Sequence, residues 1–183
     1  EIAGDTTSFG ITGTGTANVS GAPTFLDGNN TGSISTASSH TFNVFPGTYS
    51  FSETLPDGWS LVSNDCTNIV VSNSDNKECT ITNTKNSSLT IVKKALPASE
   101  NEFEFNLVKG GNTISTFGLI DNSNDTDASK TFSLLPGTYS VFENDYSTSW
   151  NTFSSCDNGD SVESISLASG DSVTCTFTNT KYA

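Results

Sequence analysis

Residues 41–59 read TFNVFPGTYSFSETLPDGW, and residues 131–150 read TFSLLPGTYSVFENDYSTSW. The chain thus aligns with itself at an offset of 90 residues (131 minus 41). Further on, CTITNTK at 79–85 matches CTFTNTK at 175–181, after a six-residue length difference in a loop (175 minus 79 is 96). Self-similarity over the length of a domain indicates tandem copies of one fold.

Each copy has the pattern of short β-strands. Apolar residues alternate with polar ones on both sides of the Pro-Gly pairs at 46–47 and 136–137, where a turn between two strands is expected. Such alternation gives each strand one apolar face, as a sandwich of two small sheets requires. We therefore predict an all-β protein with two tandem Ig-like β-sandwich domains, residues 1–85 and 86–183.

The composition excludes several classes of function. The chain has 20 acidic residues, seven lysines and no arginine, with a formal net charge of -13. Nucleic acid and anionic membrane surfaces bind clustered lysine and arginine, so neither is an expected partner. No apolar stretch is long enough for a transmembrane helix, so we expect no membrane insertion in this segment. The sequence has no HExxH, GxSxG or phosphate-loop motif, and we expect neither an enzyme nor a bound cofactor.

The four cysteines form two close pairs, Cys66 with Cys79 and Cys156 with Cys175. An even count in a β-rich chain indicates two disulfides and an oxidising, extracellular setting. Zinc is a weaker interpretation, because neither spacing is that of a CxxC knuckle and the chain has a single histidine. The acidic run DNSNDTD at 121–127 could offer oxygens to calcium, but it lacks the Gly and Glu of an EF-hand loop. We therefore expect no metal site.

Two adjacent lysines end the stretch LTIVKKA at 89–95. Side chains alternate between the two faces of a strand, so if Leu89 and Ile91 point into the core, Lys93 points inward as well and Lys94 points into solvent. The same alternation aims Glu143 inward, and Asn179 inward in the last strand. An unpaired charged lysine in an apolar interior is very costly, so something must neutralise it.

The segments SLTIVKKA, PGTYSxxE and TNTK resemble those of Cna B-type, or prealbumin-like, domains in SpaA-type pilins and other bacterial or archaeal surface proteins. The resemblance covers both halves of the chain and implies two prealbumin-like sandwiches. In that family a first-strand lysine, a Glu after the Tyr strand and a last-strand Asn form an intramolecular isopeptide bond. The resemblance gives these roles to Lys93, Glu143 and Asn179.

Each of these three residues also has an ordinary interpretation. Lys93 could be an exposed lysine that discourages edge-to-edge pairing, Glu143 a surface residue, and Asn179 a turn former at the end of a strand. The cysteine pairs are a departure from the family, since most members with an isopeptide bond lack them. A disulfide with such loop lengths already contributes about 3 kcal/mol, so the isopeptide bond could be dispensable here.

The first copy retains Glu53 and Asn83 but has no matching lysine strand. Aligning the strand around Phe9 with the strand around Phe105 leaves only residues 1–8 upstream, and none of them is a lysine. The first domain thus lacks an evident first strand, and its last strand should have an unpaired edge. The sequence could begin inside the domain, a shorter strand could replace the missing one, or a neighbouring subunit could donate it. Glu53 and Asn83 are then either vestigial or partners in an intermolecular bond.

We expect an extracellular structural subunit, a building block of a stalk, pilus or surface fibre, whose partners are copies of itself. The alternative is an adhesin or a module that binds carbohydrate or a host protein. Asn18, Asn29, Asn86 and Asn124 begin N-x-S/T sequons and are candidate glycosylation sites. The stretch TGTGTA at 12–17 predicts a flexible hairpin between strands.

Overall fold

The described part of the chain consists of strands and connecting loops. The computed structural model describes residues 5–18, 20, 24–35, 38–122 and 128–183. These residues contain no helix, and so none that is long and apolar enough to cross a membrane. The all-β prediction is confirmed.

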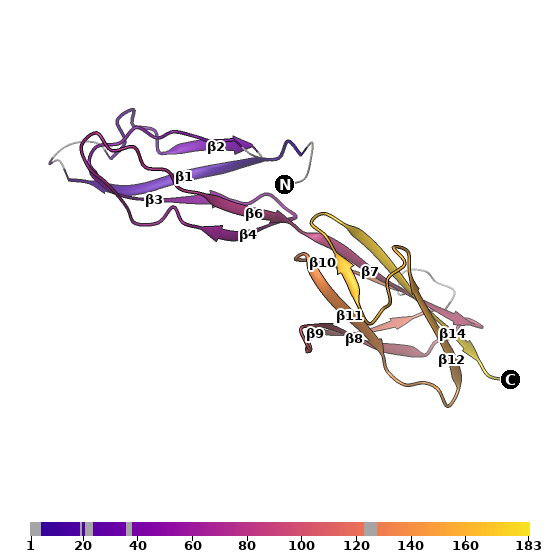
Figure 1. The fold of residues 1–183 in the computed structure, drawn as a ribbon. Helices are drawn as coiled ribbons and strands as arrows, with labels where there is room; N and C mark the ends of the chain where they lie inside the picture. Colours follow the sequence, from indigo (N-terminus) through magenta and orange to yellow (C-terminus); the bar gives the residue numbers. More distant parts are fainter. Residues whose placement is uncertain (1–4, 19, 21–23, 36–37, 123–127) are drawn as a thin grey trace. The chain divides into compact units, whose positions relative to one another are not determined.

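The chain divides into two compact units, Glu1–Thr84 and Lys85–Ala183, one residue from the predicted boundary. In the first unit, the described residues form two sheets (Figure 1). The larger has the strand order β2-β1-β3-β5 with antiparallel neighbours, and β4 and β6 form the smaller. The strands are β1 (Ser8–Ala17), β2 (Thr31–Ser35), β3 (Gly47–Thr54), β4 (Trp59–Asn64), β5 (Ile69–Val71) and β6 (Ile81–Lys85).

The TGTGTA stretch lies inside β1, so the prediction of a hairpin there was wrong. A Cβ atom on Gly13 would lie 2.6 Å from the Phe25 ring and 2.8 Å from the Phe51 ring, and one on Gly15 would lie 2.5 Å from the Tyr49 ring. Glycine in a strand interior often marks such a close approach. These glycines therefore make room for the aromatic core of the first unit.

One predicted strand is nearly absent from the first unit. Residues 41–44 make a single isolated bridge, between Val44 and Phe25. Their repeat counterparts in the second unit belong to a full strand, β10 (Ser129–Leu134), which pairs with β7 (Ser87–Leu96). The difference has a physical reason, because no described strand of the first unit occupies the place of β7.

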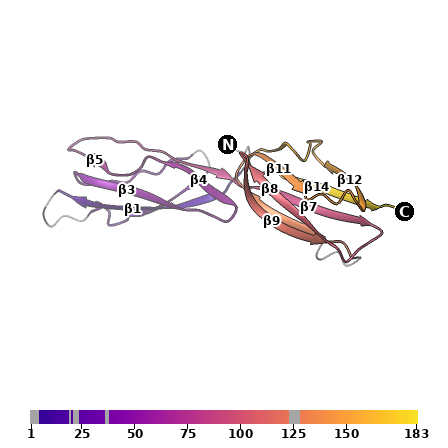
Figure 2. The same cartoon turned by 90° about the horizontal axis from the view of Figure 1, so that it is seen from below.

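The second unit forms two four-stranded sheets, in the orders β10-β7-β14-β12 and β13-β11-β8-β9. Figure 2 shows β7 and β14 side by side, and they pair in parallel. The remaining strands pair antiparallel. Besides β7 and β10, the strands are β8 (Glu102–Lys109), β9 (Asn112–Ile120), β11 (Gly137–Glu143), β12 (Trp150–Cys156), β13 (Ile165–Leu167) and β14 (Ser172–Lys181).

The core of the second unit lies between these two sheets. Alternate residues of β7, β8 and β14 are buried, as a strand with one face on the core requires. Phe105 of one sheet and Phe177 of the other meet edge to face, with ring centroids 5.1 Å apart. This contact joins the two layers close to the site described below.

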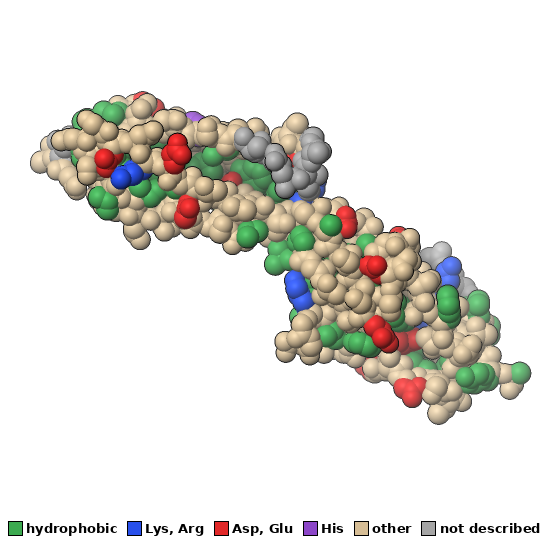
Figure 3. All heavy atoms as spheres, in the orientation of Figure 1, with side chains coloured by type: hydrophobic (Ala, Val, Ile, Leu, Met, Phe, Trp, Pro, Cys, Tyr) green, Lys and Arg blue, Asp and Glu red, His purple; other side chains and the backbone are tan. Residues whose placement is uncertain are grey.

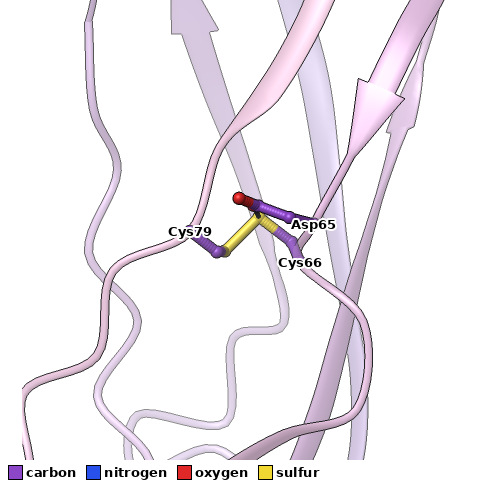
Figure 4. Close-up of side chains that lie close together, drawn as sticks. All are labelled: Asp65, Cys66 and Cys79. Atoms are coloured by element: carbon purple, nitrogen blue, oxygen red, sulfur yellow. Dashed lines mark hydrogen bonds between the residues drawn. A yellow bond between two sulfur atoms is a disulfide. The ribbon is translucent and has the colours of Figure 1, made fainter.

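Both pairs of cysteines form disulfides, Cys66 with Cys79 and Cys156 with Cys175. The second disulfide links β12 to β14, where its two cysteines lie opposite each other. Figure 4 shows Asp65 beside the first disulfide, where one oxygen and two sulfurs lie within 4.8 Å of one another. Cysteine binds a metal as a thiolate, and these two sulfurs are joined in a disulfide, so the cluster is a covalent cross-link with one carboxylate beside it.

One face of the molecule shows how acidic side chains are distributed over the surface. On the face drawn in Figure 3, acidic side chains are scattered among uncharged polar atoms. Several large apolar side chains are also exposed, among them Phe153 of β12 and Val62 of β4. Scattered acidic charge favours solubility and gives no cationic surface to an anionic partner.

Candidate cross-linking site

Three strands bring Lys93, Glu143 and Asn179 together. In the parallel pair β7 and β14, Lys93 lies opposite Phe177, so Asn179 follows two residues later on the same face. Glu143 comes from β11 in the facing sheet, where it lies opposite Phe105. The three side chains therefore meet between the layers of the sandwich.

All three side chains are withdrawn from solvent. Lys93 is 1% exposed, Asn179 is 0% exposed, and the Glu143 side chain is 5% exposed. Lys94, the next residue of β7, is exposed. The alternation along the strand thus separates an interior lysine from a solvated one.

The Glu143 carboxyl lies between the amine and the carboxamide. Its Oε1 is 3.4 Å from Lys93 Nζ and accepts a hydrogen bond of 3.1 Å from Asn179 Nδ2. The Lys93 amine also donates to the backbone oxygens of Lys94 at 3.1 Å and Phe177 at 3.4 Å. The Glu143 carboxyl, which can carry a proton, thus lies next to both the Lys93 amine, a possible nucleophile, and the Asn179 carboxamide, a possible acyl group.

The surroundings favour the neutral forms of this pair. Burial lowers the pKa of the Lys93 amine below its ordinary value, and the attraction of Glu143 opposes this shift only in part. Burial likewise raises the pKa of the Glu143 carboxyl, against the opposing attraction of Lys93. Both directions favour an uncharged amine beside a protonated carboxyl, which are the forms needed for attack on an amide.

Two buried acceptors at the site have no hydrogen-bond partner, Glu143 Oε2 and Asn179 Oδ1. Leaving such groups unpaired is costly, and two acceptors cannot satisfy each other unless one of them carries a proton. A proton on Glu143 turns its carboxyl into a donor. The unsatisfied oxygens are thus consistent with a protonated Glu143 that polarises the Asn179 carbonyl.

The Phe103 ring lies next to the Lys93 amine and packs against Trp150, and the sequence analysis did not predict these contacts. The Lys93 amine lies 4.1 Å from the centroid of the Phe103 ring, which meets Trp150 edge to face at 5.5 Å. Asp121 accepts a hydrogen bond of 2.7 Å from the backbone nitrogen of Ala95 and so anchors the end of β7. The alternation of apolar residues in FEFNLV, residues 103–108, was the available signal for Phe103, since Phe103 and Phe105 share the buried face of β8.

The first unit holds the same acid and amide, and among its described residues no lysine is seen paired with them. Asn83 Nδ2 donates to Glu53 Oε2, and the buried Asn83 Oδ1 has no partner. Glu53 lies opposite Ile11, as Glu143 lies opposite Phe105, so Ile11 corresponds to Phe105. The sequence alignment of the strands in this region was therefore two residues out of register. A slip of two residues keeps every side chain on its face, so alternation alone could not detect it.

The sequon residues lie apart from this site. Asn18 and Asn29 are exposed, and Asn86 is half-buried between β6 and β7. Asn29 Oδ1 accepts hydrogen bonds from the backbone and the hydroxyl of Thr31, its sequon partner. Asn124 lies outside the described residues.

The architecture defines a class, a tandem prealbumin-like β-sandwich protein with an interior Lys–Glu–Asn cluster in its second domain. The family model described as "Prealbumin-like fold domain" (SpaA_2) matches residues 3–92 and 85–177. The chain therefore belongs to the prealbumin-like fold domain family. None of the curated proteins matches the chain.

Several solved structures match the chain at low sequence identity. The T-13 major pilin protein of Streptococcus pyogenes is 15% identical, with 97% of this chain and 91% of that chain covered and a TM-score of 0.38. A Mobiluncus mulieris adhesin with intramolecular disulfide, isopeptide and ester cross-links is 12% identical, with coverages of 98% and 86% and a TM-score of 0.44. A B repeat unit of the Staphylococcus aureus collagen-binding surface protein is 15% identical, with coverages of 96% and 88% and a TM-score of 0.35.

Proposed function

We propose that the protein is an extracellular structural subunit of a stalk, pilus or surface fibre, strengthened by covalent links within its β-sandwiches. Membership of the prealbumin-like family and the pilin and adhesin names of its structural neighbours support this proposal. The observation that carries it is the buried cluster of Lys93, Glu143 and Asn179 between the first and last strands of the second domain. Copies of the chain are the proposed assembly partners.

The position of this cluster suits a domain that bears tension. Strands β7 and β14 are the first and last of the unit, so a pull on its two ends reaches both of them directly. They are parallel neighbours held by a ladder of hydrogen bonds. A bond between Lys93 and Asn179 carries the load across this ladder, so the rest of the domain does not need to unfold.

The proposed reaction converts an amine and a carboxamide into a secondary amide and ammonia. The neutral Lys93 Nζ attacks Cγ of Asn179 while the protonated Glu143 polarises the carbonyl. The Cγ–Nδ2 bond breaks, and Glu143 passes a proton from the attacking to the leaving nitrogen, which departs as ammonia. Each molecule reacts once, so this is maturation of a structural protein and involves no turnover of a substrate.

Peptide mapping tests the proposed bond. We expect trypsin to leave the chain uncut after Lys93 and to yield a branched peptide that joins residue 93 to residue 179. The Lys94→Met variant, altered at the solvated neighbour, should yield the same branch. Normal cleavage after Lys93, together with a linear peptide that contains an unmodified Asn179, would overturn the proposal.

A binding module is the second candidate, favoured by a groove in the first unit. The groove has a volume of about 450 Å³ and is lined by Gly13, Gly15, Thr24, Phe25 and Asn30, among others. The state of the purified protein separates the two functions. Ladders that resist SDS support the fibre subunit, whereas a monomer that retains a glycan or a host protein supports the adhesin.

A further inference from the structure

The second unit has a sheet edge that its own fold leaves open. Strand β12 stands last in the order β10-β7-β14-β12, so β14 pairs with one of its edges, and no described strand pairs with the other. Natural proteins protect such edges with charged residues, proline or very short strands, because a free edge can pair with another chain. The sequence of β12, WNTFSSC, contains no charged residue and no proline.

The other sheet edges of this unit are short or lie against each other. Strand β13 has only three residues. Lys130 of β10 lies 5.2 Å from the centroid of the Phe117 ring of β9, and Phe132 of β10 meets that ring edge to face at 5.0 Å. The edges of β9 and β10 thus border one another, and Lys130 adds a charge there. Strand β12 is the long edge without such protection.

The central side chain of β12 is a solvated aromatic ring. Phe153 is 67% exposed, the largest exposed fraction among the large apolar side chains of the described residues. It points away from the core, because Trp150 and Cys156, on the opposite face of the strand, are buried. A strand added at this edge would bring a side chain next to the ring and remove apolar surface from water.

The backbone of β12 offers free hydrogen-bonding groups along the open edge. Asp157, directly after the strand, donates its N–H to the Thr174 oxygen of β14 at 2.9 Å. Backbone groups alternate in direction along an antiparallel strand, so the odd-numbered residues of β12 bond to β14. The N–H and C=O groups of Thr152 and Ser154 therefore point to the open edge.

This edge is complementary to itself. The Trp150 N–H and the Cys156 C=O, at the two ends of the strand, already have partners in turns of their own chain. In an antiparallel pairing of two β12 strands centred on Phe153, these two occupied groups lie opposite each other. The free groups of Thr152 in one copy then face those of Ser154 in the other, so the pattern of free and occupied groups matches.

The charge of the chain also favours approach by this edge. Two copies repel one another, because each has a formal net charge of -13. Strand β12 contributes no charge, and the side chains of β14 on the same outer face are threonines, at positions 174, 176, 178 and 180. Two copies that meet through β12 therefore bring little negative charge into the contact.

We propose that β12 is an interface between two copies of this chain, which pair edge to edge, antiparallel and centred on Phe153. The sheets that contain β12 in the two molecules become one continuous sheet. The two Phe153 rings face each other in a non-hydrogen-bonded pair, where opposite side chains are closest. This pairing gives the proposed structural subunit a lateral contact and in that respect rests on the proposed function.

The pairing is weak in dilute solution. Two strands of seven residues bury less surface than a permanent dimer needs, so the contact takes effect where copies are crowded, as they are in a fibre or on a surface. Added salt strengthens the contact, because salt screens the repulsion between acidic copies while the interface itself contains no ion pair.

Sedimentation equilibrium of the full chain over a range of concentrations tests this pairing. We expect a reversible equilibrium between monomer and dimer, with a Kd of roughly 1 mM or below. The dimer fraction should rise as salt is added. A chain that stays monomeric at about 1 mM, or an association that weakens with salt, would overturn the proposal.

Two variants alter the edge in different ways. Phe153→Lys places like charges opposite each other, and Ser154→Pro removes an N–H that points away from β14. Each should raise the Kd roughly tenfold or more. Phe142→Lys makes the same change at an exposed ring of β11, in the other sheet, and should dimerise as the unmodified chain does. Circular dichroism checks folding. A dimer that persists in both edge variants, or that Phe142→Lys abolishes, would place the interface elsewhere and overturn the proposal.

A cysteine substitution tests the register. Cα atoms of a non-hydrogen-bonded pair lie about 4.5 Å apart, within the range that a disulfide spans, about 4.4 to 6.8 Å. Oxidised Phe153→Cys should therefore give a covalent dimer in which residue 153 is joined to residue 153, whereas Phe142→Cys should not. A link from residue 153 to another position would contradict the register. The intact mass of the single chain reports the bond between Lys93 and Asn179 separately, so failure of one proposal is distinguishable from failure of the other.

Discussion

At the scale of single residues, the central feature is a lysine whose surroundings favour its uncharged form. The proposed bond needs Lys93, whereas Lys94 differs from it mainly in facing solvent. We predict that Lys93→Met abolishes the loss of ammonia and that Lys94→Met leaves it unchanged. Glu143→Gln should also abolish the loss, because a carboxamide does not relay the proton. Intact mass is the measurement, and ammonia loss in Lys93→Met would contradict the assignment.

The titration of Glu143 gives a second prediction at this scale. In Lys93→Met the carboxyl stays buried and loses the cation that lowers its pKa, so its folded pKa lies above the ordinary value of 4.5. Above that pH the unfolded state releases a proton that the folded state retains, so stability is greatest in acid and falls as pH rises towards the folded pKa. The slope is about 1.4 kcal/mol per pH unit.

Denaturant unfolding at a series of pH values, from about 4, the ordinary carboxyl pKa, to about 8, measures how the unfolding free energy of Lys93→Met changes with pH. The double variant Lys93→Met with Glu143→Gln is the matched control, because it lacks both the bond and the titrating group. Its stability should vary less over this range. Equal pH profiles for the single and double variants would show that Glu143 has an ordinary pKa.

The sequence predicts which side chains of a strand point inward, because buried and exposed residues alternate along it. Alternation aimed Lys93, Glu143 and Asn179 at one interior, because period two is a strong constraint on a strand with one buried face. It could not reveal Phe103 beneath the amine, because that contact depends on how the two sheets face each other. Alternation also tolerated the two-residue slip at Phe9, which became visible only through the pairing of Glu53 with Ile11.

At the scale of elements, covalent links distinguish the two sandwiches. The disulfide of the first unit closes a separation of 13 residues and contributes about 3 kcal/mol. A bond from Lys93 to Asn179 would close 86 residues (179 minus 93) and contribute about 4.6 kcal/mol on the same basis. With the proposed bond in place, only the second unit would retain a covalent link after full reduction.

We therefore predict that reductant exposes the first unit to unfolding at a lower denaturant concentration than the second. Hydrogen exchange followed by mass spectrometry should show β3 losing protection before β11. In Lys93→Met the interval between the two should shrink, because the second unit has then lost its link. Simultaneous loss of protection in the reduced wild-type chain would contradict this account.

Element boundaries show where sequence reasoning fails. The Pro-Gly pairs correctly indicated the starts of β3 and β11, because a turn residue acts locally. The stretch TGTGTA was mistaken for a turn because its glycines serve distant aromatic rings, and local sequence does not show such contacts. Residues 41–44 have the alternating pattern of their counterpart in β10. No described strand takes the place of β7 beside them, so they do not form a strand despite this pattern.

At the scale of the whole molecule, the two repeats form domains whose buried apolar cores differ in size. In the described part of the first unit, five apolar side chains are buried, namely Phe9, Ile11, Phe25, Tyr49 and Cys66. The second unit has a larger core assembled from both of its sheets. Stability rises with buried apolar area, so the first unit should be the weaker domain.

Calorimetry of the full chain should therefore show two transitions, with the first unit melting at the lower temperature. One cooperative transition for the whole chain would contradict this account.

The proposed bond between Lys93 and Asn179 is tested most directly by the intact mass of the unmodified chain after complete reduction and denaturation. Reduction returns about 2 Da for each disulfide, so any remaining deficit belongs to another bond. We predict a mass about 17 Da below that of the sequence, the mass of one ammonia. A mass equal to that of the sequence would contradict the account.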